Sequence, residues 1–260
     1  MRTVRVESIG ISDRGLRRHH NEDAFLVRDD LGLYVVADGM GGHAAGEVAA
    51  GLAVSEIERT VEATLDAAET TWPDGWDPSL PCDSNRLAFA SLLAHRRVTG
   101  AVEGDPALRG MGATVVTALL SPGRERLTVG HVGDSRAYLF RDGRLELLTS
   151  DHSWVHEQVV AGLLSKDAAR SHPLKNVVTR ALGGAQEPTA EVREHEIRAG
   201  DVLLLCSDGL NAMLEDDEVA DILRRRLPEL RVAARELINE ANRRGGVDNI
   251  TIILVRLIAE

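Results

Sequence analysis

Four aspartates lie at the ends of apolar, strand-like segments that are far apart along the chain. Asp38, Asp134 and Asp208 each follow such a segment, and Asp248 directly precedes one. A single aspartate after a strand usually belongs to a turn, but four converging carboxylates would repel one another by about 3 kcal/mol per pair, at about 5 Å and an effective dielectric constant of about 20. Divalent cations would offset that repulsion, and oxygen ligands suit Mg²⁺ or Mn²⁺ better than zinc. The pattern therefore predicts a site for one of these ions.

Two neighbouring segments add cations and glycines to this pattern. Residues 14–23 place Arg17 and Arg18 a few positions before an acidic pair, so that an anion and a metal could be bound side by side; a solvated run of surface charge is the alternative. Residues 38–47 are rich in glycine between a predicted strand and a predicted helix, as in phosphate-binding loops. The segment lacks both a Gly-Lys-Ser/Thr sequence and G-x-G-x-x-G spacing, so nucleotide binding is not expected.

The elements that must position these residues begin with short β-rich segments. Asp142-Gly143 predicts a two-residue hairpin turn between two of them, because both residue types tolerate positive φ. Many of the strands are therefore expected to be antiparallel. The predicted strands span residues 5–11, 24–27, 33–37, 114–120, 127–132, 137–140, 145–148, 192–197, 202–206 and 250–255.

Helical periodicity marks further segments that occur in two pairs. Since these pairs do not alternate regularly with single strands, the sequence predicts an α+β fold in one domain, with two packed sheets and helices outside. In the first helix, an apolar stripe that includes Val48, Ile57 and Val61 is expected to face inward. The predicted helices span residues 47–68, 85–98, 217–227 and 230–243.

Length and charge exclude several classes of protein. The 260 residues carry a net charge of −11, which argues against a general affinity for nucleic acid or an anionic membrane. The apolar runs are too short to cross a bilayer, and the N-terminus lacks the apolar stretch of a signal peptide. Cys82 and Cys206 are too few for a disulfide framework or a cysteine-rich metal site. We expect a cytoplasmic protein without a membrane segment, and a monomer by default.

Taken in chain order, eight short motifs resemble the metal-dependent PPM family of protein serine/threonine phosphatases (type 2C), and in particular its compact bacterial members. The resemblance implies a four-layer α-β-β-α sandwich, with a metal cluster at one end and a variable flap at residues 153–173. It covers nearly the whole chain, so we expect one phosphatase domain over residues 1–260. The motifs are RHHNED (18–23), DGMGGH (38–43), GAT (112–114), GDSR (133–136), TSDH (149–152), TRALG (179–183), CSDGL (206–210) and VDNIT (247–251).

The resemblance implies a set of metal ligands at matching positions. Asp38 would bridge two Mn²⁺ or Mg²⁺ ions, and the carbonyl of Gly39 would ligate one of them. Asp208 and Asp248 would complete the coordination of the other ion. Asp134 together with Asp208 would form a third, weaker site.

Other residues would act on the phosphate or on the ligands. Arg18 resembles the phosphate-binding arginine of the family, although Arg17 beside it competes for that assignment. Glu22, Asp23 and Asn249 would hold metal-bound waters or orient the ligands. An arginine suits the phosphate-binding role because its guanidinium can donate to two phosphate oxygens at once.

The implied reaction is hydrolysis of phosphoserine and phosphothreonine monoesters by direct attack of a metal-bridging hydroxide, without a phosphoenzyme. The leaving alkoxide needs an acid, and His43 is the candidate because it lies in the same loop as Asp38 and Gly39. Eukaryotic relatives place a histidine directly after the Asp-Gly pair, where this chain has Met40. His43 could therefore be no more than a residue at the start of a helix.

The expected partners are phosphorylated proteins, including a bacterial serine/threonine kinase and its substrates. A catalytically weak regulatory module that binds a phosphorylated partner on the same fold is the alternative. A metal-dependent nuclease is disfavoured by the acidic balance and by the lack of a basic stripe. Six histidines show no metal-ligand spacing and are expected to be ordinary surface or core residues: His19, His20, His95, His131, His156 and His195.

Overall fold

A computed structural model describes residues 4–41, 45–65, 77–123 and 125–259 of the chain. Ten antiparallel strands form two five-stranded sheets, in the orders β1-β10-β9-β6-β7 and β2-β3-β4-β5-β8. The strands are β1 (Val4–Asp13), β2 (Asp23–Arg28), β3 (Leu33–Met40), β4 (Gly112–Leu120), β5 (Arg126–Val132), β6 (Arg136–Arg141), β7 (Arg144–Leu147), β8 (Glu191–Glu196), β9 (Val202–Cys206) and β10 (Ile250–Ala259).

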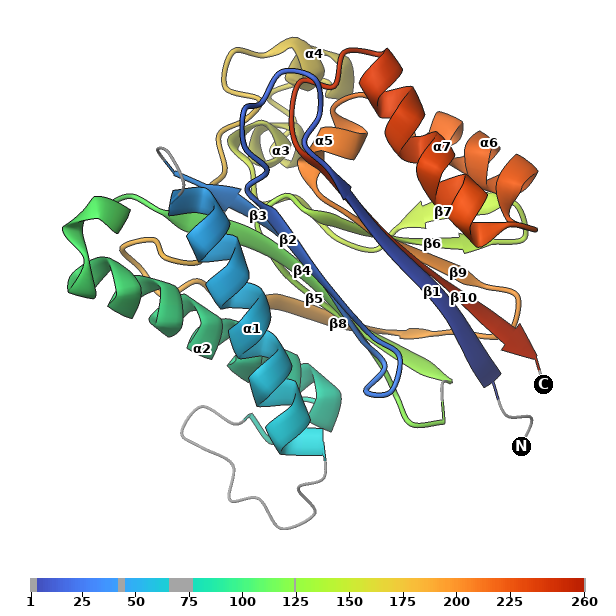
Figure 1. Cartoon of the computed structure of the whole chain (residues 1–260), viewed down its shortest axis with the longest axis horizontal. Coiled ribbons are helices and arrows are strands. Elements are labelled where there is room, and N and C mark those ends of the chain that lie inside the picture. The colour runs from blue at the N-terminus through green and yellow to red at the C-terminus, as the bar shows by residue number, and fades with distance from the viewer. Residues whose placement is uncertain (1–3, 42–44, 66–76, 124, 260) are drawn as a thin grey trace.

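Two helix pairs cover the outer faces of the sheets (Figure 1). The helices α1 (Ala45–Leu65) and α2 (Cys82–Gly104) pack on the second sheet. On the other side, α6 (Asp216–Arg226) and α7 (Leu230–Arg243) pack on the first sheet. The expected four-layer α-β-β-α sandwich, an α+β fold, is confirmed.

The central strands are buried on both faces, which explains their continuous apolar sequences. Along β3, Val35 and Ala37 belong to the core beneath α1 and α2. Tyr34 and Val36 point the opposite way, into the core between the two sheets, as the period of two along a strand requires. The molecule therefore has three stacked cores, one between each pair of layers.

The pairing register brings the ends of distant strands to one end of the sandwich. In the second sheet, Asp23 at the start of β2 is opposite Asp38 near the end of β3, and Asp38 is opposite Thr114 near the start of β4. In the first sheet, the end of β1 is opposite the start of β10, and the start of β6 is opposite the end of β9. Antiparallel pairing thus brings together segments that are far apart along the chain, such as Asp13 of β1 and Ile250 of β10.

Several details differ from the sequence-based expectation. The helix predicted at 85–98 spans 82–104, and the strand predicted at 250–255 continues to 259. The strand β3 does not end at Ala37 but continues through Asp38 and Gly39 to Met40, paired with β4. On α1, Val48 is 38% exposed, whereas Ala49 and Ala53 are fully buried. Ile57 and Val61 of the predicted stripe are fully buried, so the prediction is confirmed there and departs only in the first turns of the helix, where small alanine side chains let α1 lie close to its neighbours.

The remaining helices are short and lie near the end of the sandwich where the aspartates gather (Figure 1). They are α3 (Trp154–Val160), α4 (Lys166–Ser171) and α5 (Asp208–Asn211), with one 3₁₀ turn at Pro106–Leu108. An isolated bridge from Ser153 to Val178 closes the base of the excursion that contains α3 and α4. None of the described helices is long and apolar enough to span a membrane.

Candidate active site

Five carboxyl groups converge at this end of the sandwich: those of Asp23, Asp38, Asp134, Asp208 and Asp248, here called the carboxylate cluster. The side chains of Asp38 and Asp208 are within hydrogen-bonding contact, although they come from different sheets. The negative charges of the other four members all act on Asp38. The four aspartates singled out in the sequence are therefore brought together, and Asp23 joins them.

The cluster is electrostatically unfavourable as it stands. Burial, followed by the neighbouring carboxylates, raises the pKa of Asp38 well above its ordinary value. The same causes raise the pKa of Asp134 to about 7 and that of Asp208 to about 6. Burial also raises the pKa of Asp23 to about 7. Such a site gains from a positive charge placed among these groups.

Two buried oxygen atoms point to the kind of positive charge that fits. Asp208 Oδ1 and Asp23 Oδ1 have no hydrogen-bond partner within the described part of the chain. A buried carboxylate oxygen without a donor is costly, and a cation would relieve that cost. Since the donor atoms are carboxylate oxygens, hard divalent ions such as Mg²⁺ or Mn²⁺ suit them. The residues present therefore fit the divalent ions implied by the sequence.

Gly39 brings backbone directly into this site. Its N–H donates to the carbonyl of Glu22 at 3.2 Å, and a Cβ at this position would lie 2.1 Å from the carbonyl oxygen of Gly46. No side chain can be accommodated there, so the start of α1 packs directly against the end of β3. This close approach brings the first turn of α1 against the residue that directly follows Asp38.

Asn249 joins the two loops that carry the outer part of the site. The side chain is 4% exposed; its Oδ1 accepts from the N–H of Glu22 at 2.8 Å, and its Nδ2 donates to the carbonyls of Arg14 and His20, both at 2.9 Å. All polar atoms of the amide are used in holding residues 14–22 against the start of β10. Asn249 therefore acts on the shape of the site, which agrees with an orienting role.

Asp23 is held by two hydroxyl groups. Its Oδ2 accepts from Ser207 at 2.8 Å and from Thr251 at 2.6 Å. These hydrogen bonds fix the carboxylate so that the other oxygen, Oδ1, faces the cluster without a donor. Thr251 thus contributes to the site through a contact that the sequence motifs did not reveal.

The structure distinguishes the two neighbouring arginines. Arg18 Nη2 donates to Asp248 Oδ2 at 2.6 Å, and its side chain remains 48% exposed. Asp38 and Glu22 also act on its charge. Arg17 is exposed in the preceding turn, where its backbone N–H donates to the Gly246 carbonyl at 3.1 Å. The guanidinium that lies at the rim of the carboxylate cluster is therefore that of Arg18.

A cleft of about 560 Å³ opens beside the cluster. Asp134 and Asp208 line one part of it, and Val155, Val159 and Lys166 of the predicted flap line another. Its wall thus combines apolar and cationic side chains with the carboxylates. A polypeptide next to a group bound at the cluster would find contacts of both kinds here.

Two further predictions concern the loop after β3. His43, the candidate acid, lies outside the described residues. Met40 ends β3 and is opposite Gly112 in the sheet; a Cβ at Gly112 would lie 3.6 Å from the Met40 side chain. This contact agrees with a packing role for Met40.

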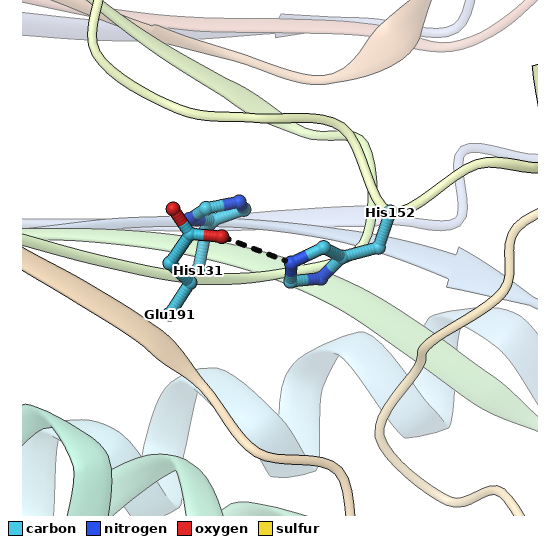
Figure 2. Close-up of side chains that lie close together, drawn as sticks. All are labelled: His131, His152 and Glu191. Atoms are coloured by element: carbon cyan, nitrogen blue, oxygen red, sulfur yellow. Dashed lines mark ion pairs between the residues drawn. The ribbon is translucent and has the colours of Figure 1, made fainter. Parts of the chain in front are cut away.

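The sequence analysis missed one group of side chains altogether. His131, His152 and Glu191, here called the imidazole cluster, have nitrogen and oxygen atoms within 4.8 Å of one another (Figure 2). His152 belongs to the TSDH motif, but nothing in the spacing of His131 or Glu191 connects them to it. The antiparallel pairing of β5 with β8, which places His131 opposite Glu191, creates this group.

The comparisons with known proteins agree with this site. A family model described as "Protein phosphatase 2C" matches residues 16–240. The chain is 38% identical to the serine/threonine phosphatase stp of Listeria welshimeri, over 94% of this chain and 93% of the relative. It is 42% identical to the serine/threonine protein phosphatase PstP of Mycobacterium tuberculosis, over 95% of this chain but only 44% of that relative's length.

Solved structures of phosphatases are also similar to this chain. The crystal structure of the Mycobacterium tuberculosis phosphatase PstP/Ppp has a TM-score of 0.84 and 36% identity, covering 97% of this chain and 99% of that one. The catalytic domain of PstP "in complex with 2 Manganese ions" has a TM-score of 0.83 and 34% identity, covering 98% of this chain and 100% of that one. Together with the matching family model, these relatives establish that the chain belongs to the protein phosphatase 2C family.

Proposed function

We propose that this chain is a metal-dependent protein phosphatase that hydrolyses phosphoserine and phosphothreonine monoesters in proteins. The observation that carries the proposal is the carboxylate cluster beside the exposed guanidinium of Arg18: five acids, two of them with buried oxygens that lack a donor among the residues that the structure describes. The relatives with this fold are named serine/threonine phosphatases, and one was solved with two manganese ions.

The residues that would hold two Mn²⁺ or Mg²⁺ ions are Asp38, the Gly39 carbonyl, Asp208 and Asp248. Asp134 and Asp208 would hold a third, weaker ion. When bound, such ions lower the pKa of water and offset charge on the phosphoryl oxygens, which supplies the nucleophile that phosphate monoester hydrolysis needs. The proposed ligands come from both sheets, so the intact sandwich is required to form the site.

Arg18 would bind the phosphoryl group of the substrate. Its guanidinium has five N–H donors, and the single donor used on Asp248 leaves others free to donate to two phosphate oxygens. The contact with Asp248 also fixes the direction of the side chain, which lowers the entropy lost on binding. Phosphate bound in this way is oriented next to the carboxylate cluster.

Glu22, Asp23 and Asn249 would keep these groups in place. Asn249 holds the loop that carries Arg18 and Glu22, and Asp23 is fixed by Ser207 and Thr251. We retain His43 as the candidate donor of a proton to the leaving alkoxide. If the variant His43→Ala hydrolyses a phosphothreonine peptide at the wild-type rate, another acid fills that role.

We further propose that residues 1–260 act as one phosphatase domain whose flap (residues 153–173) contacts the substrate polypeptide through the adjoining cleft. Because the relatives are bacterial phosphatases, the expected partners are a bacterial serine/threonine kinase and the proteins that it phosphorylates. A monomer working in the cytoplasm is the simplest form of this proposal.

Hydrolysis measured with and without Mn²⁺ tests the proposed function. The substrates are a phosphothreonine peptide and p-nitrophenyl phosphate, with EDTA-treated protein as the reference. We expect turnover of both substrates only when Mn²⁺ is added. If the protein binds the peptide but neither substrate is turned over at any Mn²⁺ concentration, the regulatory module replaces the enzyme as the explanation.

A further inference from the structure

The imidazole cluster (Figure 2) contacts the turn that carries Asp134, because His152 Nδ1 lies 3.1 Å from the backbone nitrogen of Gly133. His131 and His152 are 2% and 5% exposed, and Glu191 Oε2 lies 3.6 Å from His152 Nε2. Three side chains of this kind within 4.8 Å of one another could suggest an additional metal site. Their hydrogen bonds and ring geometry indicate a different role.

The two rings are stacked, with centroids 4.6 Å apart and planes 18° from parallel. An imidazole binds a metal through a lone pair in its ring plane, at about 2.0–2.1 Å. Two stacked, nearly parallel rings cannot both place one ion in their planes at that distance. Arg180 Nη1, at 3.4 Å from His152 Nε2, adds a positive charge that also disfavours a cation.

The hydrogen bonds determine where the protons are. His131 Nε2 lies 2.8 Å from the carbonyl of Ser150, which can only accept, so this nitrogen carries a proton. His152 Nδ1 lies 3.1 Å from the N–H of Gly133, which can only donate, so this nitrogen accepts. His152 is therefore neutral, with its proton on Nε2, which lies 3.6 Å from Glu191 Oε2. Because a guanidinium can only donate, the 3.4 Å contact of this nitrogen with Arg180 Nη1 is then not a hydrogen bond. Burial, which lowers the pKa of His152 to about 4, agrees with this assignment.

His152 holds Gly133 from both sides. The ring accepts from the N–H of Gly133, and the backbone N–H of His152 donates to the carbonyl of Gly133 at 2.9 Å. Gly133 has a φ of 109°, and a Cβ there would lie 2.4 Å from Thr114. This left-handed turn is followed directly by Asp134, so holding Gly133 restrains the backbone from which the Asp134 carboxylate projects.

We propose that His152 is a positioning residue for Asp134, with Glu191 fixing its tautomer, and that the imidazole cluster itself binds no metal. The inference rests on the proposed role of Asp134 in the weaker ion site. It assigns a function to the TSDH segment, which supplies none of the proposed ligands, and it makes the affinity of that site depend on a residue from another loop.

Two amide substitutions separate the ring nitrogens of His152. In His152→Asn, Oδ1 takes the place of Nδ1 and can still accept from Gly133. In His152→Gln, the amide lies near the position of Nε2, and the N–H of Gly133 loses its acceptor. We expect His152→Gln to weaken the weakest Mn²⁺ site by about 10-fold or more, and His152→Asn to weaken it by less than about 3-fold.

The measurement is Mn²⁺ binding to the full chain, counted by the electron paramagnetic resonance signal of free Mn²⁺. Glu191→Ala is the second variant, with an expected loss of about 3-fold, and it decides the question if His152→Gln does not fold. Glu194→Ala is the matched control. Glu194 lies on β8, like Glu191, and its substitution removes only an ion pair with Arg126 of β5, so this variant should bind Mn²⁺ like the wild type.

Three results would overturn the inference. The first is that His152→Gln binds Mn²⁺ like the wild type, and the second is that His152→Asn loses as much Mn²⁺ affinity as His152→Gln. The third is that a Mn²⁺ ion is lost in His152→Gln and Glu191→Ala but kept in Asp134→Asn. The last result would mean that the imidazole cluster binds the ion. A wild-type protein that binds Mn²⁺ without hydrolysing the phosphothreonine peptide would instead contradict the proposed function, independently of these affinities.

Discussion

The carboxylate cluster and the imidazole cluster are both groups of buried, ligand-type side chains, yet they differ in how their polar atoms are satisfied. In the carboxylate cluster, Asp208 Oδ1 and Asp23 Oδ1 have no donor within the described residues, and like charges face each other. In the imidazole cluster, His131 and His152 each have a backbone partner. Glu191 Oε1 of the imidazole cluster also has no hydrogen-bond donor within the described residues, but it lies 2.6 Å from Arg193 Nη2 in an ion pair. The first group therefore gains from an added cation, whereas the second is already paired with a cationic side chain.

This difference shows that the number of ligand-type side chains is a poor guide to a metal site. Five carboxylates without enough donors form a site whose free energy falls when a cation binds. Two histidines that hydrogen-bond to backbone groups, with a glutamate beside them, form a structural link between strands and a turn. The following predictions test whether the two groups respond to substitution in these different ways.

The largest effect is expected for Asp208→Asn. Asp208 is a proposed ligand of the two-ion centre and also of the third, weaker ion. Loss of its charge should therefore lower Mn²⁺-dependent hydrolysis of a phosphothreonine peptide by about 1,000-fold or more. The folded structure should be retained, because an amide relieves repulsion among the carboxylates. Asp217→Asn, an exposed substitution on α6, is the control. An active Asp208→Asn variant would contradict the ligand assignment.

The next largest effect is expected for Arg18. Replacement by alanine should lower kcat/KM by about 100-fold, and replacement by lysine by nearly as much, because lysine cannot donate to two phosphate oxygens in the same planar geometry. Steady-state kinetics at saturating Mn²⁺ measures this. Arg17→Ala, one position earlier, should change kcat/KM by less than about 3-fold; the reverse order would assign the phosphate to Arg17.

For the imidazole cluster, the expected effect is on stability. His131→Leu removes the donor to the carbonyl of the partly buried Ser150 and should lower the free energy of unfolding by about 1 kcal/mol or more. His131→Gln, whose amide can still donate near the Nε2 position, should lose less than half of that. Denaturant unfolding gives these values. The number of bound Mn²⁺ ions should be the same in both variants, and a lost ion would mean that His131 is a ligand.

The smallest effect is a pH dependence in the carboxylate cluster. The pKa of Asp134 is raised to about 7 in the folded protein, so its protonated form contributes stability at low pH that is lost as the pH rises through about 7. In EDTA, Asp134→Asn should therefore match the wild type near pH 4 and exceed its stability by about 1 kcal/mol near pH 8. Thermal unfolding at both pH values measures the difference, and a constant difference would contradict the raised pKa.

Much of the fold could be predicted from the sequence because its patterns are local. The helix at 230–243 and the strand at 202–206 have the predicted bounds, and the Asp142-Gly143 turn has the expected positive φ at both residues. The inward face of α1 was only partly predicted, because Val48 is partly exposed while Ala49 and Ala53 are buried. Periodicity of large side chains cannot reveal a helix that packs through small ones.

The candidate site, like the fold, could be predicted only in part from the sequence. The sequence by itself determined that four aspartates lie at or near the ends of buried strands: Asp38, Asp134, Asp208 and Asp248 follow or precede apolar runs, and such runs must become buried strands because of the hydrophobic effect. Only the tertiary structure decided which neighbours they meet, that Arg18 rather than Arg17 faces the acids, and that His152 contacts Gly133. These contacts depend on strand register and on loops that cross between sheets, and both are set by packing over the whole sandwich rather than by nearby residues.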